Sequence, residues 1–237
     1  MKKLLSIFAI FLLLGAVVGI SGCMTEPTNS TTTTTASSTE TSAQGGPPAD
    51  RGVPEEGVGY EVNLSGVPVQ NLSQDEIDAI LYMREEEKLA RDVYLTLYNV
   101  TGIPVFSNIA RSEQAHMDMV KELIDRYNLT DPAEGMGIGE FTNPDIQDLY
   151  NQLVERGTQN DVEALKVGAL IEEVDIKDLE EWLNRTDNED IQMVFDTLMS
   201  GSYNHLRAFT RILSQKYGVT YSPQLLSEEE YSKIVGS

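Results

Sequence analysis

The 237-residue sequence has little cysteine, little histidine, little positive charge and almost no strand-like alternation of apolar and polar residues. Its one cysteine excludes a disulfide framework within the chain. It has 17 lysines and arginines and 38 aspartates and glutamates, which give a net charge of −21. Because so acidic a surface repels nucleic acid, we expect no nucleic-acid partner. The scarcity of strand signals indicates an all-α protein.

The chain begins with the pattern of an export signal. Lys2 and Lys3 precede a long apolar run, which ends in ISGC at 20–23. This ending resembles the lipobox of bacterial and some archaeal lipoproteins, in which the signal is cut before a lipid-bearing cysteine. The resemblance implies a signal peptide over residues 1–22 and lipidation of Cys23, and hence an extracytoplasmic protein anchored by lipid to the outer face of the cell membrane. The alternatives are a signal with an incidental cysteine and an uncleaved anchor.

A tether follows the signal, because residues 25–50 are mostly threonine, serine, glycine and proline and cannot bury a core. We expect the lipidated cysteine and linker to span residues 23–71. One helical domain of ordinary size is expected over 72–221, with a C-terminal tail at 222–237.

Helix signals divide this domain into four long helices. Ser73 and Glu76 can form a capping box at the first start, and Gly218 follows the last helix. The expected ranges are about 73–99, 107–127, 158–184 and 188–217. A shorter helix is expected from Asn143, with Pro144 in its first turn, inside the long connection between helices two and three. This pattern predicts a four-helix bundle with one long crossover, as in ferritin-like proteins.

Each apolar stripe is interrupted near its middle by a side chain that is costly to bury. The interruptions are Glu87, Glu113 with His116, Glu172 and His205. Taken alone, such a glutamate is usually a boundary residue and such a histidine is usually hydrogen-bonded. Together, three carboxylates and both histidines of the chain favour a shared pair of divalent metal ions. Glu113 and His116 lie on one helical face, so Glu113 can bridge two ions while His116 binds one.

Two motifs carry a resemblance to known families. EKLARDVY at 87–94 is similar to the helix-one motif of rubrerythrins and bacterioferritins, and EQAH at 113–116 resembles their Glu-x-x-His. The range 73–217 resembles an uncharacterised ferritin-like family, domain of unknown function 2202, whose signatures match GALIEEVDIKDL and GSYNHLRAF. The resemblance implies two metal ions, iron first and manganese or zinc as alternatives, with Tyr94 beside them. It also implies reaction with peroxide or dioxygen.

One position departs from the ferritin pattern. Ser202 stands where helix four usually carries a glutamate three residues before its histidine. Asp175, one turn after Glu172, is the candidate replacement. The centre is then expected to be asymmetric, to hold one ion tightly or to prefer another metal. Glu173 and the first two glutamates of the run at 85–87 are expected on solvated faces.

Three function classes follow. An oxidoreductase of peroxidase or ferroxidase type would need a separate electron donor, because one cysteine cannot build the four-cysteine iron site of a complete rubrerythrin. A lipoprotein that only binds or delivers metal is the second class, and a degenerate bundle used for protein contacts is the third. The sequence leaves open whether the protein is an enzyme and whether it forms a homodimer.

Overall fold

The computed structural model describes residues 62–236, so the predicted signal peptide, Cys23 and most of the linker lie outside the described residues. Six α-helices and no strand are found within 62–236. They are α2 (Gln74–Thr101), α3 (Pro104–Arg126), α4 (Pro144–Gly157), α5 (Asp161–Leu183), α6 (Glu189–Tyr217) and α7 (Glu228–Val235). The predicted all-α fold is confirmed, as are its four long helices.

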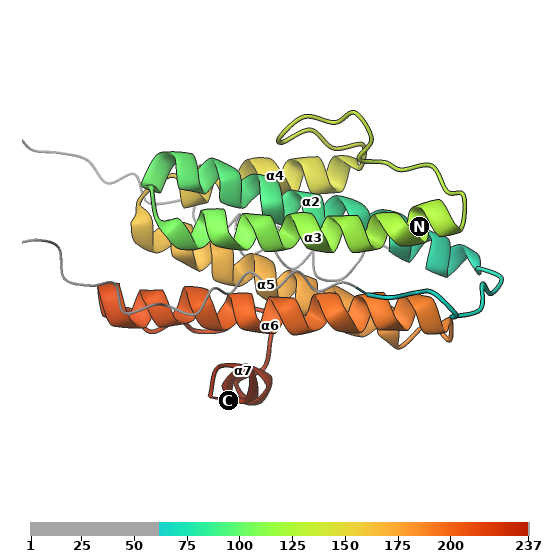
Figure 1. Cartoon of the computed structure of the whole chain (residues 1–237). Helices are drawn as coiled ribbons and strands as arrows, with labels where there is room; N and C mark the ends of the chain where they lie inside the picture. Colours follow the sequence, from blue (N-terminus) through green and yellow to red (C-terminus); the bar gives the residue numbers. More distant parts are fainter. Residues whose placement is uncertain (1–61, 237) are drawn as a thin grey trace, which may run out of the picture.

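The four long helices lie side by side as two antiparallel hairpins (Figure 1). One hairpin is α2 with α3 and the other is α5 with α6, and they join where α2 packs on α5 and α3 packs on α6. Helix α4 belongs to the long crossover between the hairpins and packs on α2 and α5. The small helix α7 packs on α6 near the C-terminus. The predicted crossover with its short extra helix is therefore present.

Local signals fix the helix ends. The Ser73 side chain accepts from the Glu76 N–H while the Glu76 side chain accepts from the Ser73 N–H, which is the expected capping box. Gly102 closes the turn between α2 and α3 with a φ of 65°, a conformation that favours glycine. Helix α5 begins at Asp161, later than predicted, because the Asn160 side chain caps it by accepting from the Glu163 N–H.

The core is continuous along the bundle. Tyr94, Phe106 and Phe209 come from three different helices and pack against one another as tilted rings, with centroids 5.3 to 6.1 Å apart. None of the three side chains is exposed to solvent. This aromatic cluster fills the bundle on one side of its middle and leaves the middle itself to polar groups. Within residues 62–236 no helix is both long and apolar enough to cross a bilayer.

The prediction that Glu85 and Glu86 lie on a solvated face is wrong, since both are buried. The crossover covers this face of α2. Glu85 Oε1 accepts hydrogen bonds from the N–H groups of Thr142 and Asn143, at 2.6 and 3.1 Å, just before α4. Nearby, buried Lys88 donates to the carbonyl of Gly137 in the same crossover. The periodicity of α2 could not show that a second segment covers its outer face.

The same prediction is wrong for Glu173, whose exposed fraction is 0 %. The chain after α6 folds back over α5 at this position. The carboxylate of Glu173 accepts from the Tyr221 hydroxyl at 2.6 Å and from the N–H groups of Gln224, Leu225 and Leu226. A buried carboxylate thus holds the C-terminal segment against the bundle.

Candidate metal centre

The structure brings all of the predicted ligands together in the middle of the bundle. Each long helix contributes, and no contributing residue is more than 7 % exposed. The residues are Glu87 from α2, Glu113 and His116 from α3, Glu172 and Asp175 from α5, and His205 from α6. Side chains from helices far apart in the sequence therefore meet in one dry region, as the interrupted stripes predicted.

Glu113 lies between the two histidines. Its Oε2 is 2.8 Å from Nδ1 of His116, and its Oε1 is 2.9 Å from Nδ1 of His205. Glu87 Oε2 lies 3.1 Å from the first nitrogen, and Glu172 Oε2 lies 3.4 Å from the second. The donors therefore form two overlapping groups, each with one imidazole, one carboxylate of its own and one oxygen of Glu113.

This arrangement fits a metal ion in each group. Two ligands about 2.1 Å from one ion, at a right angle, lie about 3.0 Å apart, which is close to the spacings found. Glu113 Oε1 and His205 Nδ1 face each other at 2.9 Å yet make no hydrogen bond, and buried Glu87 Oε1 makes none either. Because buried polar atoms need a partner, these atoms favour a cation between them.

The pKa shifts in the centre arise from carboxylates and imidazoles that face each other. Burial alone would raise the pKa of Glu113, but the two facing imidazoles hold it below its usual range. Burial would lower the pKa of His205, but the facing carboxylates of Glu113 and Glu172 raise it to about 10. Burial raises the pKa of Glu87 to about 7, although His116 opposes that shift. A metal ion must therefore displace protons from the imidazoles when it binds.

Neighbouring groups hold the ligands in place. The Tyr94 hydroxyl donates to Glu172 Oε1 at 2.5 Å, and Nε2 of His205 lies 2.9 Å from the Ser112 hydroxyl. Such contacts fix the orientation of a ligand and the tautomer of an imidazole. The structure thus places Tyr94 against a predicted ligand, on the opposite side from the imidazole of His205.

Ser202 does not leave a simple gap where a glutamate was expected. Its hydroxyl donates to Asp175 Oδ2, while Asp175 Oδ1 has no hydrogen-bond partner. Asp175 belongs to neither donor group, but it lines the adjoining cavity. Whether Asp175 replaces the absent carboxylate stays a prediction.

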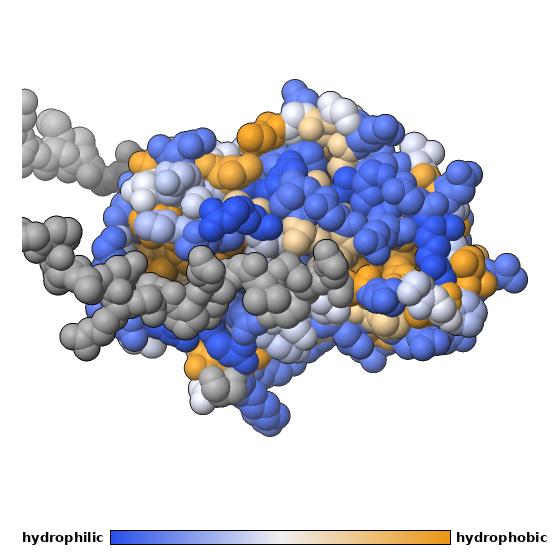
Figure 2. Space-filling view, viewed as in Figure 1, coloured by the Kyte–Doolittle hydropathy of each residue, from blue (hydrophilic) through white to orange (hydrophobic). Residues whose placement is uncertain are grey.

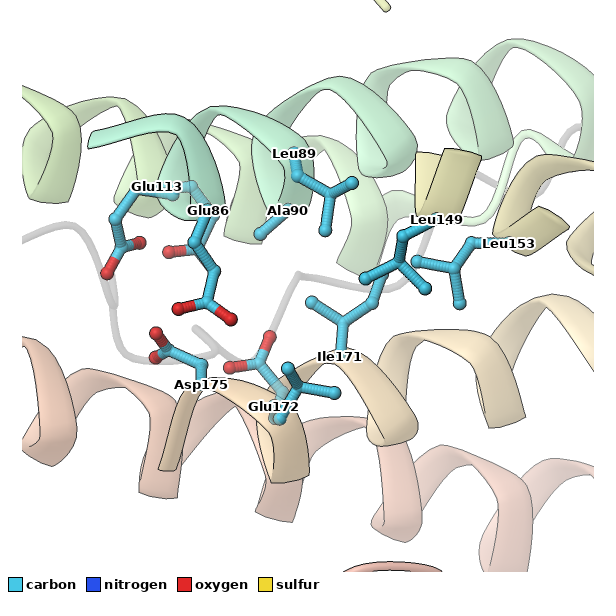
Figure 3. A pocket seen from close by; sticks show the side chains of 11 residues that line it. Glu86, Leu89, Ala90, Glu113, Leu149, Leu153, Ile171, Glu172 and Asp175 are labelled. Atoms are coloured by element: carbon cyan, nitrogen blue, oxygen red, sulfur yellow. The ribbon is translucent and has the colours of Figure 1, made fainter. Parts of the chain in front are cut away.

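A small cavity adjoins the centre (Figure 3). Its volume is about 10 Å³, which is room for one water-sized molecule. The figure shows the labelled carboxylates gathered on one side of it and labelled leucine and isoleucine side chains on the other. Two of the leucines, Leu149 and Leu153, come from α4, so the crossover helix closes the cavity.

The family model for an uncharacterised protein domain, DUF2202, matches residues 76–237. The chain belongs to the DUF2202 family. The match runs through α7, so the DUF2202 domain includes the C-terminal segment that Glu173 holds.

One relative of this DUF2202 chain is the uncharacterised protein MJ0754 of Methanocaldococcus jannaschii. It is 55 % identical over 174 residues, which are 73 % of this chain and 94 % of the relative. The crystal structure of the hypothetical protein MJ0754 matches with a TM-score of 0.70, and the match covers 72 % of this chain and 97 % of that one. Neither name states an activity, so the function must be argued from the residues of the DUF2202 domain itself.

Sequence reasoning missed one acidic residue of the DUF2202 cavity. Glu86 lines it together with four of the predicted residues, yet it was assigned to a solvated face. Glu86 and Tyr82 are one turn apart on α2, and Tyr82 donates to Asp178 of α5 at 3.1 Å. This side of α2 therefore faces α5, and testing α2 for a second buried face would have identified Glu86.

Proposed function

We propose that this protein is an exported, lipid-anchored, ferritin-like protein that binds two divalent metal ions, iron first, and reacts with peroxide or dioxygen. The observation that carries the proposal is the position of Glu113. Its two oxygens face two different histidines at 2.8 and 2.9 Å, which is the arrangement expected of a carboxylate that bridges two ions.

Each side chain has a role in this proposal. His116 and Glu87 would hold one ion, His205 and Glu172 the other, and Glu113 both. If bound there, a pair of iron ions would supply the electrons that reduce an oxidant, which no amino-acid side chain of the centre can do as readily. Tyr94 keeps Glu172 oriented through its hydrogen bond, and the apolar wall of the cavity excludes bulk water.

The size of the cavity supports a very small oxidant. About 10 Å³ admits a molecule as small as water, and the closing leucines of α4 leave no room for an organic substrate. The single cysteine supports a separate electron donor, because the chain cannot hold a rubredoxin-like iron site.

Export and anchoring are supported by sequence alone. The basic start, the apolar run and the ISGC sequence at 20–23 favour cleavage before Cys23 and lipidation of that cysteine. With a net charge of −21, the protein would be held at an anionic membrane surface by its lipid rather than by electrostatic attraction.

A second candidate function is metal binding or delivery without catalysis. Ser202 favours it, because a serine hydroxyl bonded to Asp175 stands where ferritins place a carboxylate ligand. A centre with fewer firm ligands would release its ions more readily. A bundle used only for protein contacts is the weakest candidate, because it gives no reason to bury three carboxylates around two imidazoles.

The test is anaerobic loading of the detergent-solubilised full chain with ferrous iron, followed by peroxide or oxygen. We expect two iron ions per chain and the near-ultraviolet absorption of an oxidised iron pair. The variants His116→Ala and His205→Ala should lose the absorption, whereas Gln114→Ala, a neighbour on α3, should keep it. Bound iron that does not react would favour the delivery function, and no bound metal of any kind would refute the metal centre.

A further inference from the structure

Glu86 is a buried acid for which the predicted centre has no use. Its side chain comes from α2, one residue before Glu87, and it is 3 % exposed. Within residues 62–236 its carboxylate oxygens meet no N–H or hydroxyl donor, and the polar group that faces them is a second acid, Asp178 of α5. A buried carboxylate beside a second acid is costly to ionise, so a cation in the adjoining cavity would stabilise its charged form.

The surroundings of Glu86 are acidic. It lines the small cavity together with Glu87, Glu113, Glu172 and Asp175 (Figure 3). Asp178, Asp175 and Glu87 all place negative charge near the carboxyl group of Glu86. A divalent cation in the cavity would instead favour the charged form of Glu86, because it attracts the carboxylate that the neighbouring acidic residues repel.

Charge balance points to one additional carboxylate. Glu87, Glu113 and Glu172 would bring three negative charges to two divalent ions that carry four positive charges. A neutral centre needs a fourth. Asp175 already accepts a hydrogen bond from Ser202 at one oxygen, whereas neither oxygen of Glu86 accepts one from an N–H or hydroxyl group.

We propose that Glu86 is a further carboxylate ligand of the metal centre, and that it supplies the charge absent at Ser202. This inference rests on the proposed metal site. Glu86 is not a member of either donor group, so ligation requires its side chain to turn across the cavity toward the ions. The ligand set would then include two consecutive residues of α2, one facing α3 and the other facing α5.

The test is calorimetric titration of the detergent-solubilised full chain with Mn²⁺, which avoids iron oxidation. Glu86→Gln should weaken Mn²⁺ binding by about tenfold or more, or abolish it at one position. Its thermal midpoint in the presence of a chelator should be no lower than that of the wild type, because glutamine keeps the shape of the side chain and, like a protonated acid, carries no charge. Adding Mn²⁺ should raise the thermal midpoint of Glu86→Gln by less than it raises that of the wild type.

Glu85→Gln is the matched control, since Glu85 is the preceding buried glutamate but bonds to the crossover. It should lower the thermal midpoint and leave Mn²⁺ affinity unchanged. If Glu86→Gln does not fold, Glu86→Asp replaces it and should also bind Mn²⁺ more weakly. If either Glu86 variant binds Mn²⁺ as tightly as the wild type, Glu86 is a buried neutral acid and not a ligand. The proposed function would still stand. A wild-type chain that binds no Mn²⁺, Zn²⁺ or Fe²⁺ would remove both proposals.

Discussion

At the scale of single residues, the candidate centre depends on small neighbours as much as on its ligands. Gly201 of α6 lies against the imidazole of His116, and a Cβ at this position would come within 2.5 Å of Nε2. The helix can therefore approach α3 closely only because position 201 has no side chain. Ser202 and His205 follow Gly201 on the same helix, so their positions depend on this close approach.

Gly201→Ala should displace His116 from Glu87 and Glu113. We expect a loss of roughly 1–3 kcal/mol in unfolding free energy from overpacking, together with weaker metal binding. Gly157→Ala is the matched control, because its Cβ would meet Leu97 at 2.7 Å, away from the predicted ligands. It should cost similar stability and leave metal affinity unchanged. Equal metal affinity in both variants, measured by calorimetry, would show that the imidazole of His116 is not needed.

At the scale of elements, two segments outside the four long helices complete the bundle. The crossover covers α2 through Glu85 and Lys88, and the C-terminal segment covers α5 through Glu173. In each case a buried charged side chain bonds to backbone groups of the covering segment. These contacts let both helices carry charged residues on more than one face without exposing them.

Glu173→Ala should release the C-terminal segment. The Tyr221 hydroxyl and the backbone N–H groups of Gln224, Leu225 and Leu226 would lose their acceptor. Hydrogen bonds to a charged group contribute about 1.5–3 kcal/mol each, so we expect a loss of at least about 2 kcal/mol. Thermal unfolding and amide hydrogen exchange over 221–235 measure it. Glu229→Ala, which breaks an exposed pair with Lys233, should change little, and continued protection of the three amides in Glu173→Ala would contradict the prediction.

At the scale of the whole molecule, the centre concentrates ionisable groups in the driest part of a very acidic protein. The pKa of Glu87 is raised to about 7 and that of His205 to about 10. A raised pKa in the folded state stabilises the fold below the ordinary pKa of the group, and this contribution is lost as the pH rises through the raised value. The pKa of Glu113 is lowered, so its contribution to stability is lost as the pH falls, and only at acid pH.

The chelator-treated protein should therefore become less stable between about pH 5 and about pH 10. Glu87 accounts for the lower part of this range and His205 for the upper part. Stabilisation by added Mn²⁺ should increase over the same range, since the ion competes with protons for the same atoms. Thermal midpoints with chelator and with Mn²⁺ measure both trends. A midpoint that rises with pH in the presence of chelator would show that the centre does not hold these protons.

The sequence by itself determined the all-α fold, the four long helices and the residues that interrupt their apolar stripes. Caps, glycines and periodicity are local properties, and they fixed most helix ends closely. The interrupted stripes also identified Glu87, Glu113, His116, Glu172 and His205, because a bundle must bring mid-helix residues of one face together.

Only the tertiary structure decided which helices bury a second face, in addition to the face toward the bundle axis. Helical periodicity distinguishes one buried face from the rest, so it assigned Glu85, Glu86 and Glu173 to solvent, whereas the crossover, α5 and the C-terminal segment bury them. The opposed positions of the two histidines around Glu113, and the bond between Ser202 and Asp175, likewise depend on side-chain distances across helices. A linear pattern carries no such distances, because they are set by how the helices pack.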